Sequence, residues 1–297
     1  MLNWALILLL GLSWGSSFFF NEILLRELGP MWISVGRVGI GALGCWVWIF
    51  LSRRSLRVSA GMWLGLGVFG LFQYAVPLTV YPATQQFITS SAAGIINAMT
   101  PIMVVIVSHF WPDGERATRL KSLGVALGFA GIIVLALPDV QADEGSSTPV
   151  ALLATMISPF CYGIAMNLLR SLAGIDRVLM TAWSLTIATV MVLPIAFARE
   201  GVPTITRVET WASLLVIGLI LTSAAFILLY WLVPRVGGTT ASTITFVAPI
   251  SAVLLGVFIL NETLTLVHLL GMAIIFVGLL FIDGRVVRLL RNHQPNG

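Results

Sequence analysis

Long apolar runs separated by short polar segments are the dominant pattern along this chain of 297 residues. A helix that crosses a bilayer needs about 20 mostly apolar residues. Measured against that length, the pattern predicts ten membrane spans, at residues 3–24, 31–51, 62–81, 87–110, 120–137, 150–169, 179–198, 211–233, 240–260 and 265–282. We therefore expect an all-α polytopic membrane protein.

Composition supports that fold class. Hydrophobic residues make up 58% of the chain, charged residues only 9%, and the mean hydropathy is +1.01. These values lie far from those of water-soluble domains. The net charge of +4 comes from basic residues between the apolar runs, which is typical of cytoplasmic loops and does not indicate a nucleic-acid partner. Cys45 and Cys161 both lie inside apolar runs, so no disulfide framework, metal site or cofactor is predicted.

The sequence contains an internal repeat, with two copies of one unit. Pro101 and Pro249 are 148 residues apart, and Glu115 and Glu262 are 147 apart. The same spacings join further pairs: Trp14-Gly15 with Tyr162-Gly163, Gly70 with Gly218, Gly124 with Gly271, and Gly131 with Gly278. We expect the glycines of the last span in each repeat to let the fifth and tenth helices pack closely. We predict a first repeat of five helices at 1–138, an outside linker at 139–149, a second repeat of five helices at 150–284, and a basic cytoplasmic tail at 285–297.

The basic residues also predict the orientation of the chain. With the N-terminus in the cytoplasm, twelve Arg or Lys residues fall in inside segments and three in outside segments, which leaves Arg37 within a span. Both termini are then cytoplasmic. Because five is an odd number of spans, the second repeat enters the membrane from the opposite side, so we expect inverted repeats around a central cavity.

Two prolines are candidates for hinges in the fourth and ninth spans. Each removes a backbone hydrogen bond, which frees the carbonyl of Asn97 before Pro101 and that of Thr245 before Pro249. Free carbonyls at matching depths favour a hydrated cavity between the repeats. The alternative is an ordinary kink whose carbonyl is satisfied by a neighbouring hydroxyl. The positions at which we expect the helices to flex are Gly15, Pro101, Gly163 and Pro249.

Polar and aromatic side chains at helical spacing form one stripe on several spans, as the wall of a central cavity requires. The alternative for each residue is an interfacial aromatic ring or a hydroxyl bonded to its own helix. The predicted substrate-binding residues are Trp14, Ser17, Tyr74, Tyr81, Asn97, Tyr162, Tyr230, Thr243 and Thr245.

Arg37 is the one clear charge within a span, about 9 Å from the outer end of its helix. An intramembrane charge is costly and is a functional hypothesis by default. The alternative is that Arg37 snorkels outward or pairs with Glu22 or Glu27. Glu115 and Glu262 are each expected to cap the last helix of their own repeat. The midplane offers no constellation of His, Asp, Glu or Cys, so we predict neither an enzyme nor a carboxylate proton relay.

The chain resembles the drug/metabolite transporter superfamily, in particular its ten-helix EamA-type members. The resemblance rests on Trp14-Gly15 and Tyr162-Gly163, on Arg37, and on the paired endings of the repeats. It implies ten helices around a central cavity that opens alternately to either side, and within the family the chain looks like bacterial exporters of amino acids, including aromatic ones.

We therefore expect a multi-pass transporter of the bacterial inner membrane that exports neutral amino acids and related small metabolites. Its partners are a small-molecule substrate and the lipid bilayer, and its oligomeric state stays open. Two alternatives remain: an exporter of drugs or quaternary cations, and a membrane scaffold or receptor that transports nothing.

Overall fold

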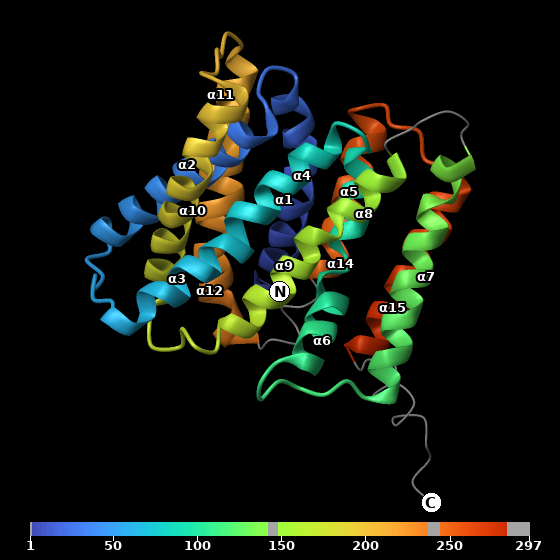
Figure 1. The fold of residues 1–297 in the computed structure, drawn as a ribbon, viewed down its shortest axis with the longest axis horizontal. Coiled ribbons are helices and arrows are strands. Elements are labelled where there is room, and N and C mark those ends of the chain that lie inside the picture. The colour runs from blue at the N-terminus through green and yellow to red at the C-terminus, as the bar shows by residue number, and fades with distance from the viewer. Residues whose placement is uncertain (1, 142–147, 237–243, 284–297) are drawn as a thin grey trace, which may run out of the picture.

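The computed structural model describes residues 2–141, 148–236 and 244–283, and within these ranges it contains helices and no strand. The predicted first repeat holds α1 (Leu2–Leu25), α2 (Pro30–Leu51), η1 (Ala60–Met62), α3 (Trp63–Gly70), η2 (Leu71–Ala75), α4 (Val76–Gln85), α5 (Ser90–Asn97), α6 (Thr100–Phe110) and α7 (Arg119–Gln141). The second repeat holds α8 (Thr148–Thr155), α9 (Ile157–Leu168), α10 (Arg177–Glu200), α11 (Val208–Leu215), η3 (Val216–Ala224), α12 (Ala225–Val236), α14 (Ile244–Phe258) and α15 (Leu266–Ile282) (Figure 1).

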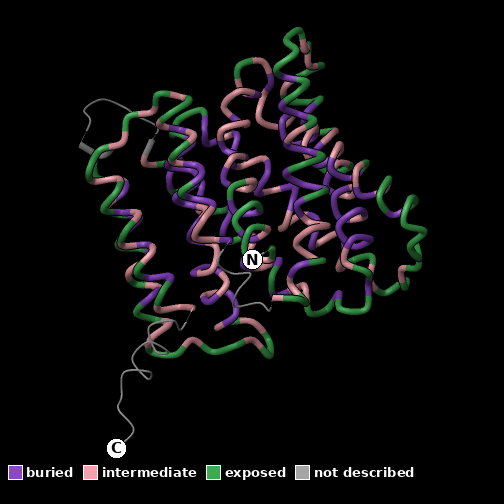
Figure 2. Tube along the Cα trace, turned by 180° about the vertical axis from the view of Figure 1, so that it is seen from behind, coloured by how far each residue is buried: buried purple, intermediate pink, exposed green. Residues whose placement is uncertain are grey.

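Helix lies in each of the ten expected ranges. By length and composition, seven helical segments of the described chain can cross a membrane, and Ile244–Phe258 and Leu266–Ile282 are shorter apolar helices. Buried positions gather where helices face one another (Figure 2). Large apolar side chains such as Leu43 and Phe258 remain exposed. The structure is thus that of a polytopic membrane protein, as predicted. The number of ten spans and the orientation of the termini remain predictions.

Helices of the two repeats pack against one another rather than forming separate bundles. The helix α2 lies along α10 and η3, α1 lies along α14, and α6 lies along α9. The pair α7 and α15 lies at one end of the molecule, and α2, α3, α10, α11 and α12 lie toward the other (Figure 1). The two repeats therefore share their interior.

The contact between α7 and α15 is reciprocal. A Cβ atom on Gly124 would lie 2.6 Å from the carbonyl oxygen of Gly278, and one on Gly278 would lie 2.6 Å from the carbonyl oxygen of Gly124. Gly131 and Gly271 repeat the arrangement at 2.8 Å in both directions. Inside a membrane the hydrophobic effect does not drive helices together, so they associate through close packing, which small residues such as glycine allow. The expected close packing of the fifth and tenth helices is confirmed.

Two π-helical segments interrupt matching helices, and the sequence pattern did not predict them. One is η2, between α3 and α4, and the other is η3, between α11 and α12. Each follows or contains a glycine in close contact with the other repeat: Gly70 lies against the carbonyl of Ser184 on α10, and Gly218 lies against Ile40 on α2. Such segments widen the helix locally and often occur at functional sites.

The two prolines differ in their effect. Around Pro101 the helix breaks, since α5 ends at Asn97 and α6 begins at Thr100. The Asn97 carbonyl accepts a hydrogen bond of 2.7 Å from the Thr100 hydroxyl, so the prediction that this carbonyl faces water is wrong and the hydroxyl alternative holds. Pro249 lies inside the continuous helix α14. The helix is therefore interrupted near the proline of the first repeat but not at the proline of the second.

Glu262 caps a helix, but not the expected one. Its carboxylate accepts hydrogen bonds from the backbone N–H groups of Ser90 (2.7 Å) and Ser91 (3.0 Å) and from the Ser91 hydroxyl. These are the first residues of α5, so Glu262 caps a helix of the other repeat. The prediction for its own repeat is wrong, because Thr265 caps α15 with His268 in a capping box.

The matching residue in the first repeat caps nothing. Glu115 precedes α7 and forms an ion pair with Lys121, and the Glu115 side chain is 65% exposed to solvent. The prediction that it caps α7 is therefore wrong as well. The two glutamates occupy equivalent sequence positions with different partners.

Two further carboxylates cap helices across long sequence distances. Glu200 accepts hydrogen bonds from the backbone N–H groups of Met31 (3.0 Å) and Trp32 (3.2 Å) at the start of α2. Glu27 accepts bonds of 2.6 Å from the Thr206 hydroxyl and from the Thr210 hydroxyl just before and within α11. Hydrogen bonds, first of all from Thr206, lower the pKa of Glu27 to about 2. On the predicted outer side, α2, α5 and α11 thus each receive a carboxylate at the helix N-terminus.

Candidate functional site

An aromatic cluster, defined here as Trp14, Tyr74, Phe226 and Tyr230, joins α1, η2 and α12. The ring of Phe226 lies 5.5 Å from that of Trp14, 5.6 Å from that of Tyr74 and 6.0 Å from that of Tyr230, measured between centroids. Aromatic rings attract one another at these separations. Thr181 on α10 places its hydroxyl 3.3 Å from that of Tyr230. The structure thus brings together three predicted substrate-binding residues from both repeats.

Phe226 stands at the centre of this cluster and was absent from the predicted site. It precedes Tyr230 by four residues, so both side chains lie on one face of α12. That spacing could have identified it. The polar pattern does not mark it, since a phenylalanine in an apolar span carries no signal of its own.

A second contact joins two more predicted residues. Tyr81 on α4 donates a hydrogen bond of 2.8 Å from its hydroxyl to Oδ1 of Asn97 at the end of α5. The ring of Phe18 on α1 packs edge-on against Tyr81 at 5.0 Å. The broken helix therefore ends in an amide that is bound by a neighbouring helix.

Arg37 on α2 reaches two hydroxyl groups on other helices. Its Nη2 donates to Oγ of Ser17 on α1 at 3.1 Å, and its Nε donates to Oγ1 of Thr222 on η3 at 3.2 Å. Arg37 is partly buried, and it links the two repeats through neutral partners.

The alternative that Arg37 pairs with Glu22 or Glu27 is wrong. Glu22 accepts a hydrogen bond of 3.0 Å from the side chain of Gln85, and Glu27 binds residues at α11. Gln85 also accepts a bond of 2.8 Å from Asn21, so this amide network joins α1 to the outer end of α4. Both glutamates thus bind other residues and not Arg37.

The structure describes two of the three remaining predicted substrate-binding residues. Tyr162 on α9 and Thr245 on α14 are partly buried. Thr243 lies outside the described residues, as do most of the predicted linker and the predicted tail. Among the residues that the structure describes, no three His, Cys, Asp or Glu side chains converge as metal ligands would.

The predicted flexible glycines occupy tight helix contacts. A Cβ atom on Gly163 would lie 2.9 Å from the carbonyl oxygen of Met103 on α6. One on Gly15 would overlap the carbonyl of Ala248 on α14. These close approaches explain why the two positions hold glycine, and a role in bending stays a prediction.

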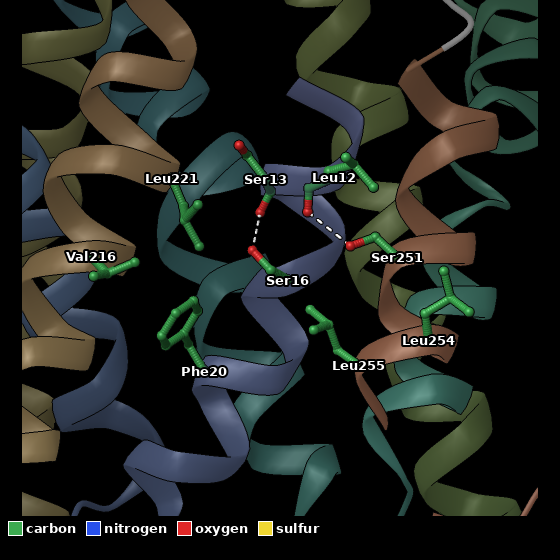
Figure 3. Close-up of a pocket in the computed structure, with 9 residues that line it drawn as sticks. All are labelled: Leu12, Ser13, Ser16, Phe20, Val216, Leu221, Ser251, Leu254 and Leu255. Atoms are coloured by element: carbon green, nitrogen blue, oxygen red, sulfur yellow. Dashed lines mark hydrogen bonds between the residues drawn. The ribbon is translucent and has the colours of Figure 1, made fainter. Parts of the chain in front are cut away.

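A groove of about 460 Å³ lies on a different face of α1 from the aromatic cluster, between α1, η3 and α14 (Figure 3). Leu12 and Leu254 on its wall are 47% and 46% exposed. Two of its hydroxyls are already bonded, from Ser16 to the Ser13 carbonyl (2.7 Å) and from Ser251 to the Leu12 carbonyl (2.9 Å). In a membrane protein such an open, mostly apolar groove suits lipid chains.

A helical membrane protein whose repeats share an aromatic and hydroxyl-lined interior has the features of a transporter. The chain belongs to the EamA-like transporter family, whose model matches residues 2–137 and 149–283. The family is part of the drug/metabolite transporter superfamily that the sequence resembles.

Curated relatives cover almost the whole chain. The protein named "Uncharacterized transporter YoaV" of Bacillus subtilis is 26% identical over 281 residues, with 90% of this chain and 92% of the relative aligned. The "Probable terminal-alkyne amino-acid exporter" of Streptantibioticus cattleyicolor is 23% identical over 296 residues, which cover 99% of this chain and 97% of that protein. A solved crystal structure with 18% identity shares the fold with a TM-score of 0.68, over 96% of this chain and 98% of that one.

Proposed function

We propose that this protein exports neutral amino acids, including aromatic ones, and related small metabolites across the bacterial inner membrane. In this proposal the interior between the repeats opens alternately to each side, and Gly15, Pro101, Gly163 and Pro249 are the points at which the helices flex. No chemistry is performed on the solute.

The observation that carries the proposal is the composition of the shared interior. The aromatic cluster offers flat apolar surface with hydroxyl groups at its edge, and Arg37 supplies one fixed charge nearby. A zwitterion with an apolar side chain matches such a surface, because its two charges largely compensate and its side chain can stack on the rings. A relative named as a probable amino-acid exporter supports the same substrate class.

An exporter of quaternary cations is the competing transporter hypothesis. Aromatic rings attract cations, and the aromatic cluster by itself would suit that substrate. The positive charge of Arg37 opposes it, since like charges in a medium of low dielectric repel strongly. A scaffold or receptor predicts no solute flux at all.

Counterflow in proteoliposomes tests the proposal directly. Vesicles that contain only this protein are preloaded with unlabelled neutral amino acids and supplied with a trace of labelled ones, without an ion gradient. We expect the label to accumulate transiently above its equilibrium level. If folded protein exchanges tetraphenylphosphonium but no amino acid, the cation hypothesis replaces ours, and if it exchanges neither, the transporter proposal fails for these substrates.

A further inference from the structure

Arg37 has hydrogen-bonding capacity that the described protein does not use. A guanidinium group carries five N–H donors in one plane. Ser17 and Thr222 accept from two of them, at Nη2 and Nε, and the described residues supply no partner for the other three. No carboxylate of the described chain lies within ion-pair distance of Arg37.

The two partners of Arg37 do not balance its charge. Both are neutral hydroxyls, and Thr222 also donates to the carbonyl of Ile217 at 2.8 Å. A partly buried cation with unused donors inside a membrane protein is costly unless an anion or water approaches it. The planar fork of a guanidinium matches the two oxygens of a carboxylate.

The positions of the partners relate Arg37 to the aromatic cluster. On α1, Ser17 follows Trp14 by three residues, and along η3 and α12, Thr222 precedes Phe226 by four. Residues three and four apart lie on one helix face, about 5–6 Å from each other. On α1 the hydroxyl that binds Arg37 is therefore one helical turn from Trp14, and Thr222 lies close to Phe226 where η3 passes into α12. A separation of one turn is comparable to that between the carboxylate and the ring of an aromatic amino acid.

We infer that Arg37 is the carboxylate-binding residue of the site, and that it orients solutes with the acid group on the guanidinium and the side chain on the aromatic cluster. The transported class would then be α-amino acids and carboxylic acids with an apolar or aromatic side chain. As a statement about transport this rests on the proposed function, but as a statement about binding it can be tested without transport.

The test measures binding of three probes to the purified full-length chain in detergent, through the ligand-induced rise in melting temperature. The probes are L-phenylalanine, 3-phenylpropionate, which keeps the carboxylate, and L-phenylalaninamide, which lacks it. We expect the wild type to bind both carboxylates at least about tenfold more tightly than the amide. Arg37→Gln should weaken carboxylate binding by roughly 10- to 100-fold and remove this preference, and Arg37→Lys should restore part of it.

Arg54→Gln is the matched control, because it removes an arginine whose ion pair with Asp176 lies in an exposed position outside the predicted spans. Its carboxylate preference should equal that of the wild type. The inference is overturned if the amide binds as tightly as the acids, if no carboxylate binds, or if Arg37→Gln keeps the preference. Should Arg37→Gln fail to fold, the wild-type preference and the Arg37→Lys variant still decide. Carboxylate binding without counterflow would sink the proposed function and leave this inference standing.

Discussion

Replacing Gly15 with alanine is expected to destabilise the protein by about 1–3 kcal/mol, the usual cost of forcing extra volume into a packed interior. The new Cβ would overlap the backbone carbonyl of Ala248 and approach the Ser251 side chain to 2.7 Å. Because a carbonyl on a helix backbone cannot rotate away, α1 and α14 would have to separate. The measurement is the melting temperature of the purified protein.

Gly67→Ala is the control for that substitution. Gly67 lies in the helix α3, and an added Cβ would meet no atom within 4 Å. Alanine favours helix over glycine by about 0.8–1.0 kcal/mol, so this variant should melt at or above the wild-type temperature. Equal melting temperatures for the two variants would show that α1 and α14 are not packed as described.

Glu262→Ala is expected to cost about 2 kcal/mol or more. It removes three hydrogen bonds to the start of α5 and leaves two backbone N–H groups there without their acceptor. Because the contact joins the two repeats, the loss should also expose the N-terminus of α5 to faster amide hydrogen exchange. Melting temperature and exchange at Ser90 and Ser91 check both effects.

The repeat supplies the matched control for this prediction. Glu115→Ala removes the equivalent glutamate, which takes part only in an exposed ion pair with Lys121. Pairs of this kind contribute about 0–1 kcal/mol. If Glu115→Ala destabilises the protein as much as Glu262→Ala does, the asymmetric cap is not what stabilises the predicted outer side.

Much of the architecture could be predicted because it depends on features that are visible in the sequence alone, such as the length of an apolar run or the spacing of glycines. Apolar run length predicted a helix in each of the ten ranges, and the recurring glycines predicted the contact of α7 with α15. The pattern of polar and aromatic residues also selected side chains that contact one another in the structure, and their role in binding a solute stays a prediction. Tyr81 and Asn97 do bond to each other, and Trp14, Tyr74 and Tyr230 do share a cluster.

The features that could not be predicted depend on which of several possible partners a group contacts once the chain has folded. Thr100 lies within reach of the Asn97 carbonyl and satisfies it, which no repeat spacing could reveal. Glu262 could cap the helix that follows it or one brought close by folding, and only the tertiary arrangement decides for α5. The π-helical segments η2 and η3 depart from the regular α-helical period, and the sequence carries no periodic signal for them.

In the proposed function, solute binds the interior at the aromatic cluster and not the groove on the other face of α1. The most direct measurement compares initial counterflow rates of labelled L-phenylalanine for Trp14→Ala and Leu254→Trp, each reconstituted at equal amounts of folded protein. Loss of a ring in a binding site costs about 2 kcal/mol or more, so Trp14→Ala should lower the rate at least about tenfold at low substrate. Leu254→Trp fills the groove and should leave the rate unchanged. The reverse result, with the groove variant inactive and Trp14→Ala active, would contradict the account.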